Sequence, residues 1–410
     1  MKLGTQYVVG LDIGTASVKV AVAENRSGKP ALRAVFKEPS GGMRKGAIVD
    51  LAEAAGAVAK AVAEVRKVAK AGLKTIYVNI GTHQVKGQSS KGIVAVSRAD
   101  SEIYQDDIDR VIRGSQAVNL APNRMIVHNV TREYIVDGAG DILDPLGLSG
   151  NRLEVSSLVV DAFAPHVKSV MRVVELAGGR VGGMVIDPLA AARSVLTKNQ
   201  RDLGTVLVEI GAGTTSVAVY EENKLQGVSV LPVGAGNITN DLAVGLRLPV
   251  PAAENLKLNY GHALAGEVNA KESVDLRKFS PEAKGMVSRR FVAEIIESRL
   301  AEIFDLVNNE LRLWGKFGQL AGGAVLTGGG AKMPGVTDLA KQVLKLSTQI
   351  GFSSGEEWSE ETAAFSEAFE DPEFVTALGL VLWGADKEHW QLSGRPTWSK
   401  AKQIWRYFLP

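Results

Sequence analysis

At 410 residues the chain is long enough to bury a large core, and its length alone predicts about two to four domains. Lys and Arg outnumber Asp and Glu only slightly, 47 against 45, so no bulk charge attracts the protein to nucleic acid. The absence of cysteine excludes disulfides and thiolate metal sites and is typical of a reducing cytosol. No apolar stretch approaches about 18 residues and the start lacks a signal-peptide pattern, so we expect a soluble body whose membrane contact comes only from its last residues.

The N-terminal part alternates strand-like and helix-like patterns. Residues 51–71 are rich in alanine and carry apolar side chains at helical spacing, which predicts a helix. A turn is expected at 26–30, where Gly and Pro interrupt the apolar pattern. The expected strands are 7–13, 18–24, 32–38 and 74–80.

The same order returns near the middle of the chain. Three strand-like runs precede a helix-like segment at 238–246, and each half places a glycine-rich turn between its first two strands. These turns are DIGTASV at 12–18 and EIGAGTTSV at 209–217. Two copies of one strand–turn–strand unit predict a duplicated α/β fold. The strand-like runs of the second half are 205–210, 215–221 and 224–232.

The two glycine-rich turns carry the chemistry. Backbone N–H groups of a tight hairpin can bind phosphate oxygens, and glycine lets a ligand approach closely. One such turn is a weak signal, but two matched turns favour a triphosphate held between them. Asp12 and Glu209 precede the turns and are expected to hold Mg²⁺ through its water shell, while Lys19 neutralises phosphate charge. The expected phosphate contacts are Gly14, Thr15 and Ala16 on one side and Gly211, Ala212, Gly213 and Thr214 on the other.

Residues 324–335, AVLTGGGAKMPG, read as a buried strand, a triple glycine and a helix that starts near Met333. Glycines at the start of a helix let a flat base and a ribose pack against the backbone. In isolation a purely structural turn explains this segment as well. Beside two phosphate hairpins, the adenosine interpretation is favoured.

The last residues, 396–410, predict a short basic helix with one apolar side. Such a helix lies in a membrane interface, and a single copy binds weakly and reversibly. The alternative is a final helix docked on the protein's own core, but the polar stretch 386–397 favours a linker. The expected membrane residues are Trp398, Ile404, Trp405, Phe408 and Leu409 among the acyl chains, with Lys400, Lys402 and Arg406 near lipid phosphates.

Together these motifs resemble those of the actin superfamily. Within it the chain resembles FtsA, the bacterial actin homologue that tethers the tubulin-like FtsZ ring to the membrane. The nucleotide motifs are shared across the superfamily, so the subfamily resemblance rests on DPLGLSG (144–150), GNITNDLA within 234–243 and the tail. Further matching stretches are VVGLDIGTASVKV (8–20), GGMRKGAIVDL (41–51), EIGAGTTSVAVY (209–220), AENLKLNYGHA (253–263) and VLTGGGAKMPG (325–335).

The resemblance implies an actin-like, ribonuclease H-like duplicated fold of two lobes, with an inserted subdomain 1C and a C-terminal amphipathic helix. Inside 1C we expect a helix within 101–119 and strands at 124–136 and 153–163, and 2B is expected to end in a helix from Ala283 onward. The expected boundaries are 1A at 1–82, 164–200 and 359–385, 1C at 83–163, 2A at 201–238 and 309–358, 2B at 239–308, a linker at 386–397 and the membrane helix at 398–410.

The resemblance also implies contacts residue by residue. In 2B, Arg299 and Glu302 match positions that contact the FtsZ C-terminal peptide, and Arg289 and Arg290 add basic charge nearby. An ordinary solvated helix face explains these four equally well. The further nucleotide contacts implied by position are Asn237, Glu254, Lys257, Gly328, Gly329, Gly330 and Lys332.

Two departures from the family pattern concern catalysis. Glu209 stands where an aspartate is common, so its longer side chain could displace a metal-bound water. Asp187 stands where a glutamate usually orients the attacking water, and its shorter reach predicts slow hydrolysis. An acidic N-cap at Asp187, with Pro188 as the first helical residue, is an equal alternative. We therefore expect a nucleotide switch first and an ATPase second.

The implied function is a peripheral tether at the cytoplasmic face of the membrane, at the division septum. ATP and Mg²⁺ fix the angle between the lobes, protomers stack head to tail, and many weak tails hold the filament by avidity. Subdomain 2B binds FtsZ, and 1C binds other division proteins. One alternative is an actin-like scaffold of a type IV pilus or secretion assembly, which differs in its partner. The other is a metabolic kinase, which needs an acceptor pocket.

Overall fold

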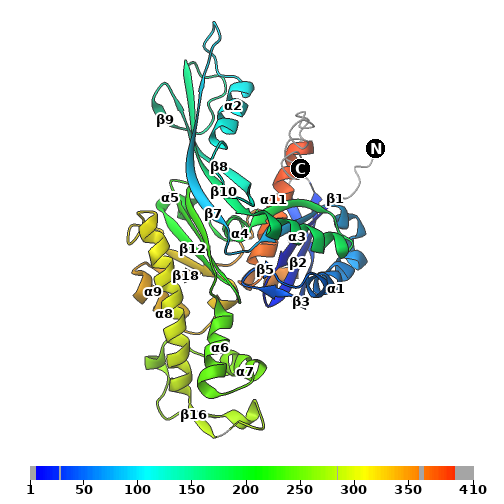
Figure 1. The fold of residues 1–410 in the computed structure, drawn as a ribbon, viewed down its shortest axis with the longest axis vertical. Coiled ribbons are helices and arrows are strands. Elements are labelled where there is room, and N and C mark those ends of the chain that lie inside the picture. Colours follow the sequence, from blue (N-terminus) through cyan, green and yellow to red (C-terminus); the bar gives the residue numbers. More distant parts are fainter. Residues whose placement is uncertain (1–5, 27–28, 284, 360–363, 393–410) are drawn as a thin grey trace.

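A computed structural model describes residues 6–26, 29–283, 285–359 and 364–392. Two sheets organise the molecule, one of five strands and one of nine. Figure 1 shows an elongated shape in which the blue first lobe stands beside the long axis. The cyan insert forms one end of that axis, and a green and yellow arm forms the other.

The first lobe is built on the five-stranded sheet, in the order β11-β6-β1-β2-β3. Helices cover both faces of this sheet, so its strands are apolar on both sides rather than alternating. In β1, Val9 and Leu11 face α1 and α3, whereas Val8 faces α4 and α11. The strands are β1 (Gln6–Ile13), β2 (Ser17–Arg26), β3 (Lys29–Pro39), β6 (Ile76–Ile80) and β11 (Val181–Ile186), and the helices are α1 (Leu51–Ala69), α3 (Ala164–Leu176), α4 (Asp187–Val195) and α11 (Val375–Leu392).

The second lobe repeats the strand–turn–strand start of the first. In the nine-stranded sheet β12, β13 and β14 are neighbours, and β12 pairs in parallel with β17 as β1 does with β6. The duplicated α/β arrangement expected from the sequence is confirmed. The elements are β12 (Thr205–Ile210), β13 (Thr215–Glu221), β14 (Lys224–Leu231), β17 (Ala324–Thr327), β18 (Thr348–Ile350), α5 (Lys198–Leu203), α9 (Val336–Leu344) and α10 (Ser366–Glu370).

The arm at the far end carries α6, α7 and the long α8. The helix expected from Ala283 onward begins only at Arg289, because Met286–Ser288 pair as a strand with Ser273–Asp275. The helix expected at 238–246 begins earlier, at Ala235. The bounds are α6 (Ala235–Leu246), α7 (Val250–Tyr260), β15 (Ser273–Asp275), β16 (Met286–Ser288) and α8 (Arg289–Leu313), with short 3₁₀ helices at Ala265–Glu267 and Leu276–Lys278.

The insert forms its own small core against four strands that extend the nine-stranded sheet. Its helix is shorter than the 101–119 expected, because Tyr104 is extended and its N–H donates to the Asp107 carboxylate at the helix start. Strand 124–136 is confirmed at those bounds. The elements are β7 (Lys86–Ala95), α2 (Gln105–Ser115), β8 (Arg124–Val136), β9 (Ala139–Ile142) and β10 (Arg152–Phe163).

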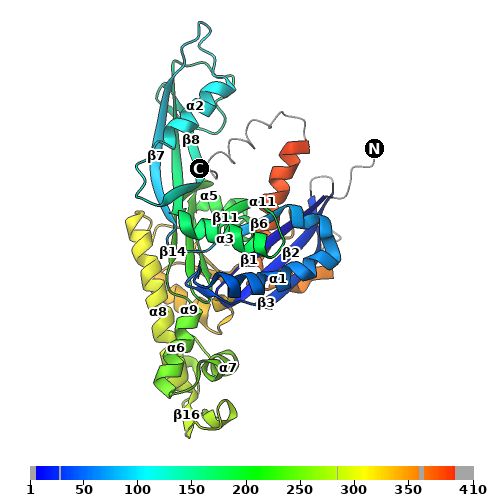
Figure 2. The same ribbon diagram turned by 45° about the vertical axis from the view of Figure 1, so that its right-hand side comes forward.

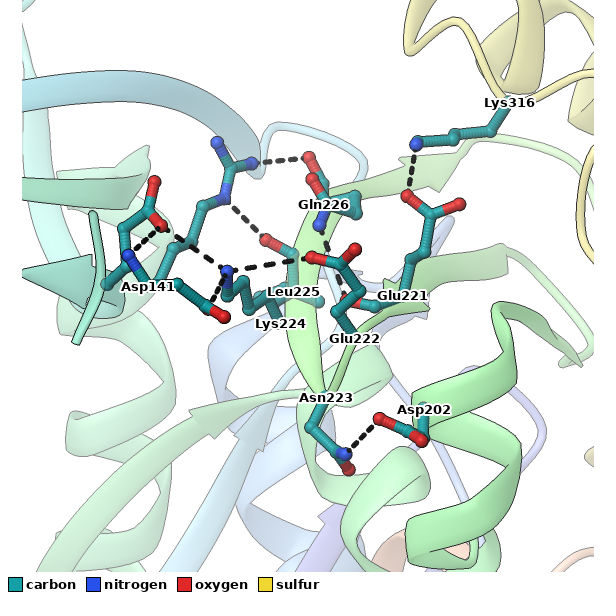
Figure 3. Close-up of polar contacts among 11 residues, drawn as sticks. Asp141, Asp202, Glu221, Glu222, Asn223, Lys224, Leu225, Gln226 and Lys316 are labelled. Atoms are coloured by element: carbon teal, nitrogen blue, oxygen red, sulfur yellow. Dashed lines mark hydrogen bonds and ion pairs between the residues drawn. The ribbon is translucent and has the colours of Figure 1, made fainter. Parts of the chain in front are cut away.

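Polar contacts fasten the insert to the second lobe. Lys224, at the start of β14, donates to Asp141 at 2.7 Å and lies 3.4 Å from Glu133 (Figure 3). Arg132 on β8 donates to the backbone carbonyls of Leu225 at 2.7 Å and Gln226 at 2.5 Å. Strands β14 and β7, both within the described ranges, pair through a single residue pair, Ser229 with Lys86. The side chains therefore supply most of the polar contact between these two parts.

We expect Arg132→Ala to lower the free energy of unfolding by about 1–3 kcal/mol, because two carbonyls lose a charged donor in a half-buried place. Chemical denaturation measures this. Arg152→Ala, which removes an exposed arginine paired within the insert to Glu154, is the matched control and should cost less than about 1 kcal/mol. Equal losses in the two variants would contradict a fastening role for Arg132.

The C-terminal part differs from expectation. Helix α11 runs through Asp386 to Leu392, so the linker expected from residue 386 does not begin there. A helix over 51–71 is confirmed to Ala69, after which a 3₁₀ helix spans Lys70–Lys74. Within the described ranges, no helix combines the length and hydropathy needed to cross a bilayer. The membrane residues expected from the sequence, Trp398, Lys400, Lys402, Ile404, Trp405, Arg406, Phe408 and Leu409, lie outside the described residues.

Candidate functional site

Two hairpins with the same closing hydrogen bond face each other across the lobes. The Gly14 N–H donates to the Ser17 carbonyl at 3.1 Å, and the Gly211 N–H donates to the Thr214 carbonyl at 2.9 Å. A Cβ added at Gly213 would lie 2.5 Å from the Thr15 hydroxyl oxygen, so the second turn touches the first. Both turns thus present glycine backbone to a shared space, as a phosphate site requires.

A third segment covers the first turn. The Gly46 N–H donates to the Thr15 hydroxyl at 3.1 Å, from the tight hairpin between β4 (Met43–Arg44) and β5 (Ala47–Ile48). Gly46 has φ +70°, and a Cβ there would lie 1.9 Å from the Gly81 carbonyl oxygen. Only glycine fits this position. Ala16 is exposed, and its carbonyl accepts from the Ser40 N–H at 3.0 Å.

A buried asparagine ties two carboxylates together beneath the first turn. The Asn79 side-chain nitrogen donates to Asp12 at 3.0 Å and to Asp187 at 2.9 Å, and its oxygen accepts from the Ile13 N–H at 2.7 Å. Lys19 pairs with the other oxygen of Asp12 at 2.6 Å. In this state Lys19 is therefore held by Asp12.

The site brings together more acidic side chains than basic ones. Burial lowers the pKa of Lys19, but the Asp12 carboxylate outweighs burial and raises it above its ordinary value. Burial, and after it the charges of Glu209 and Asp12, raise the pKa of Asp187 well above its ordinary value. Burial also raises the pKa of Glu209 from 4.5 to about 7. Three carboxylates around one lysine favour a bound cation or retained protons.

Glu209 has one satisfied and one free oxygen. The Thr376 hydroxyl donates to Oε1, which links α11 of the first lobe to β12 of the second. Oε2 is buried and has no hydrogen-bond partner among the residues that the structure describes. Within the described ranges, no cluster of three or more His, Asp or Glu side chains could hold a metal ion. Asp12 and Glu209 supply carboxylate oxygens, the ligand type that Mg²⁺ takes, and their binding of Mg²⁺ through water stays a prediction.

Asp187 is not the N-cap that the sequence left open as an alternative. Ile186 occupies that position, Asp187 is the first residue of α4, and its side chain makes no capping bond. Its carboxylate is buried instead against Asn79 and Gly81, where a Cβ would lie 2.4 Å from Oδ2. Asp187 therefore belongs to the carboxylate group of the site. Its role in orienting a water stays a prediction.

The second lobe contributes a cap and a buried ion pair. The Asn237 side-chain oxygen accepts from the Gly234 N–H at 3.1 Å and closes the start of α6. Lys257 is buried and pairs with Glu254 at 2.7 Å, while the Thr239 hydroxyl contacts both. These expected nucleotide contacts thus lie together beside α6. Their polar groups are hydrogen-bonded or ion-paired within this part of the protein.

The triple glycine lies against the second phosphate strand. A Cβ at Gly328 would lie 2.7 Å from the Ile210 carbonyl oxygen, and one at Gly330 would lie 2.3 Å from the Ile210 side chain. Gly329 is exposed beside Glu373, and Lys332 pairs with Asp371 at 3.1 Å. Gly329–Lys332 form a 3₁₀ helix, so the helix expected near Met333 begins only at Val336. The triple glycine therefore packs against Ile210 of β12, and its role in binding adenosine stays a prediction.

The profile of the cell division protein FtsA family matches residues 206–379, and that of the SHS2 domain inserted in FtsA matches residues 82–161. Cell division protein FtsA of Bacillus subtilis is 34% identical over 92% of this chain and 83% of its own length. That of Pseudomonas aeruginosa is 31% identical over 93% and 90%, respectively. The chain belongs to the FtsA family.

Solved structures of other proteins share the fold of this chain. The PilM–PilN type IV pilus biogenesis complex matches with a TM-score of 0.65 at 20% identity, over 92% of this chain and 98% of the matched chain. MreB5 of Spiroplasma citri bound to AMPPNP matches with a TM-score of 0.51 at 13% identity, over 98% and 99%. At these identities the likeness shows the fold alone. The expected actin-like fold is confirmed, and the FtsA relatives outweigh the pilus alternative.

In this FtsA-family chain, the expected FtsZ residues divide into two groups. Arg299 on α8 pairs with Asp241 on α6 at 2.6 Å and also with Glu302. They lie at a cavity of about 330 Å³ whose lining is Asp241, Glu294, Ile295, Ser298, Arg299 and Glu302. Arg289 and Arg290 instead donate to the carbonyls of Tyr260 and Val268, at 3.1 Å and 2.9 Å. These bonds connect the start of α8 to the end of α7 and to the loop at Val268, so the two arginines do not form a purely solvated face.

Sequence reasoning missed three residues of this FtsA site. Asn79 ends a strand, IYVNI, that is otherwise apolar, and an isolated polar residue at the end of a buried strand was the available signal. Gly46 lies within a quoted motif, but its contact with Thr15 needs tertiary structure. Thr376 reaches Glu209 from 167 residues away and had no sequence signal.

Proposed function

We propose that this cell division protein binds ATP with Mg²⁺ between its lobes and uses the nucleotide mainly as an assembly switch. The observation that carries the proposal is the contact between the two glycine turns, at Thr15 and Gly213, above three buried carboxylates. Backbone N–H groups on both sides can bind the same phosphates. A nucleotide placed there touches both lobes and so fixes their relative angle.

The chain's own residues have distinct tasks in this proposal. The turns at Gly14 and Gly211 orient the phosphates, and Lys19 offsets their charge. Bound Mg²⁺ would supply charge neutralisation at the phosphates. Glu209, whose other oxygen accepts from the Thr376 hydroxyl, would hold the metal's water shell through its free oxygen. Asp187, shorter than a glutamate and inclined to keep its proton, is poorly suited to activating water, which supports slow turnover.

We propose further that the protein polymerises and tethers FtsZ filaments to the cytoplasmic membrane at the division septum. Family membership supports this, together with the basic amphipathic pattern of residues 396–410. The surface of Arg299 and Glu302 is the proposed site for the FtsZ C-terminal peptide, and the insert at 83–163 the site for other division proteins. One tail binds weakly, but a filament carries many, so attachment follows assembly.

Deleting 396–410 should abolish pelleting with lipid vesicles and leave ATP affinity unchanged, because the turns and carboxylates lie elsewhere in the fold. Co-sedimentation with ATP and Mg²⁺, and a parallel ATP titration, measure the two quantities. Adding the FtsZ C-terminal peptide to the same samples tests whether the full-length chain brings it to the vesicles. Unchanged pelleting of the deletion variant would defeat the tether.

A further inference from the structure

One end of the first lobe gathers the starts of its parallel strands. Val9 of β1 and Val181 of β11 both pair with Ile76 at the beginning of β6. The Ile76 N–H donates to the Arg180 carbonyl at 2.9 Å, and the Arg180 N–H donates to the Leu73 carbonyl at 2.8 Å. The end of α1, the 3₁₀ helix Lys70–Lys74 and the loop before β11 therefore lie together.

Helix α11 leaves the lobe at this same end. Gly10 lies against Ala377, and Gly384 lies against Val8, so α11 runs antiparallel to β1. Its last turns, up to Leu392, extend past the start of β1. Figure 2 shows the red helix α11 projecting from the lobe. Leu392, the last described residue of α11, therefore lies at this end.

The exposed side chains at this end are mostly basic. Glu64 and Glu175 are paired with Lys67 at 2.6 Å and Arg172 at 3.5 Å. Among the residues that the structure describes, Arg66, Lys70 and Lys74 have no carboxylate partner. We call this surface the basic end; it comprises Arg66, Lys67, Lys70, Lys74, Arg172 and Arg180, all exposed.

Apolar side chains are exposed among these cations. Val68 at the end of α1 is 44% exposed, and Leu176 at the end of α3 is 49% exposed. The Arg66 guanidinium lies beside Gly178, so the two helix ends meet. A cavity of about 360 Å³ there is lined by Ala59, Val62, Ala63, Arg66, Lys67 and Ala177. Cations mixed with exposed apolar groups are typical of a surface that meets lipid headgroups.

We propose that the basic end contacts anionic phospholipid headgroups directly, as a second membrane anchor beside the C-terminal tail. The cations come from three separate segments and are spread over the end of the lobe, which fits a planar surface better than an extended peptide. The tail itself carries Lys400, Lys402 and Arg406, so like charge disfavours its docking on this surface. This inference rests on the proposed tether, because the tail brings this end to the bilayer.

The tail and the basic end contribute to membrane binding in different ways. Attraction between cations and an anionic leaflet fades within a Debye length, about 8–10 Å, so the basic end acts only after the tail has inserted. Once engaged, it fixes how the first lobe faces the membrane, whereas a tail alone leaves the lobe free to rotate. The affinity for vesicles should then rise with the fraction of anionic lipid, and this rise should be steeper than the cations of the tail alone would produce.

Vesicle co-sedimentation of the full-length chain tests this, with phosphatidylcholine vesicles containing increasing phosphatidylglycerol. Lys70→Glu/Lys74→Glu should weaken binding to anionic vesicles by at least about tenfold and leave binding to pure phosphatidylcholine unchanged. For Lys70→Gln/Lys74→Gln, the loss of affinity for anionic vesicles should be about half as large on a logarithmic scale. The matched control is Lys271→Glu/Lys278→Glu, two exposed lysines in the arm at the other end of the molecule, which should match the wild type within about twofold.

The outcomes separate this proposal from the tether. Wild-type affinity for anionic vesicles in Lys70→Glu/Lys74→Glu would overturn the basic end, and so would an equal loss in the Lys271→Glu/Lys278→Glu control. Trp405→Glu should lose binding to every vesicle. If Trp405→Glu instead pellets like the wild type, the tail tether fails, and with it fails the role of the basic end as an anchor that acts after the tail. If no vesicle binds the wild type, both proposals fail.

Discussion

Gly213→Asp is expected to abolish ATP binding, with a loss of at least about 100-fold in affinity. A Cβ at this position would lie 2.5 Å from the Thr15 hydroxyl oxygen, so even a methyl group forces the two turns apart. An aspartate adds a negative charge where phosphates are proposed to bind. Both effects act on the nucleotide site and leave the cores of the lobes intact. Calorimetric titration with ATP and Mg²⁺ measures the affinity.

Gly266→Asp is the matched control for this variant. Gly266 is exposed in the arm, and a Cβ there would meet no atom within 4 Å, so the same substitution should leave ATP affinity and folding unchanged. Asp12→Ala approaches the site from the other lobe. It removes the partner of Lys19 and one of the two acceptors of Asn79, and should also remove ATP binding. Near-normal affinity in both site variants would place the nucleotide elsewhere.

The sequence was sufficient where one local rule determines the structure. The strands of both hairpins follow from apolar runs interrupted by glycine, and β8 and β12 match their expected bounds. The two glycine turns, at Gly14 and Gly211, face each other as the duplication predicts. Two copies of one unit that pack across an interface present the same edge to each other. Glycine mattered at both turns because of close contact rather than unusual dihedrals.

The sequence was insufficient where a tertiary contact decides. Helix α8 starts late because β16 pairs with β15, and no local signal distinguishes those residues from a helix continuing upstream. The polar residues after Ala385 suggested a linker, whereas α11 continues through Asp386, which pairs with Arg193. Thr376 and Asn79 became site residues only when α11 and β6 were brought beside Glu209 and Asp12. Long-range hydrogen bonds of this kind carry no periodicity that a sequence displays.

The raised pKa of Glu209 predicts a pH dependence in the nucleotide-free protein. Burial raises this pKa from 4.5 to about 7, so the folded protein holds a proton that the unfolded chain releases. The stabilising contribution is therefore complete below 4.5 and is lost as the pH rises to about 7. One pKa unit corresponds to about 1.4 kcal/mol, which makes the loss on the order of 3 kcal/mol.

Glu209→Gln should remove this loss, because the amide keeps the Thr376 hydrogen bond and never ionises. Denaturation from pH 4 to 8 should then show the variant gaining stability over the wild type as the pH rises, with the residual slope coming from Asp187, whose pKa is also raised. The exposed Glu282→Gln is the control and should follow the wild type. Parallel curves for Glu209→Gln and the wild type would mean that Glu209 stays ionised in the fold.

With ATP and Mg²⁺ bound, the two proteins should exchange their order of stability. A cation near the free Oε2 favours the carboxylate form of Glu209. The nucleotide should therefore stabilise the wild type more as the pH rises, and stabilise the glutamine variant much less.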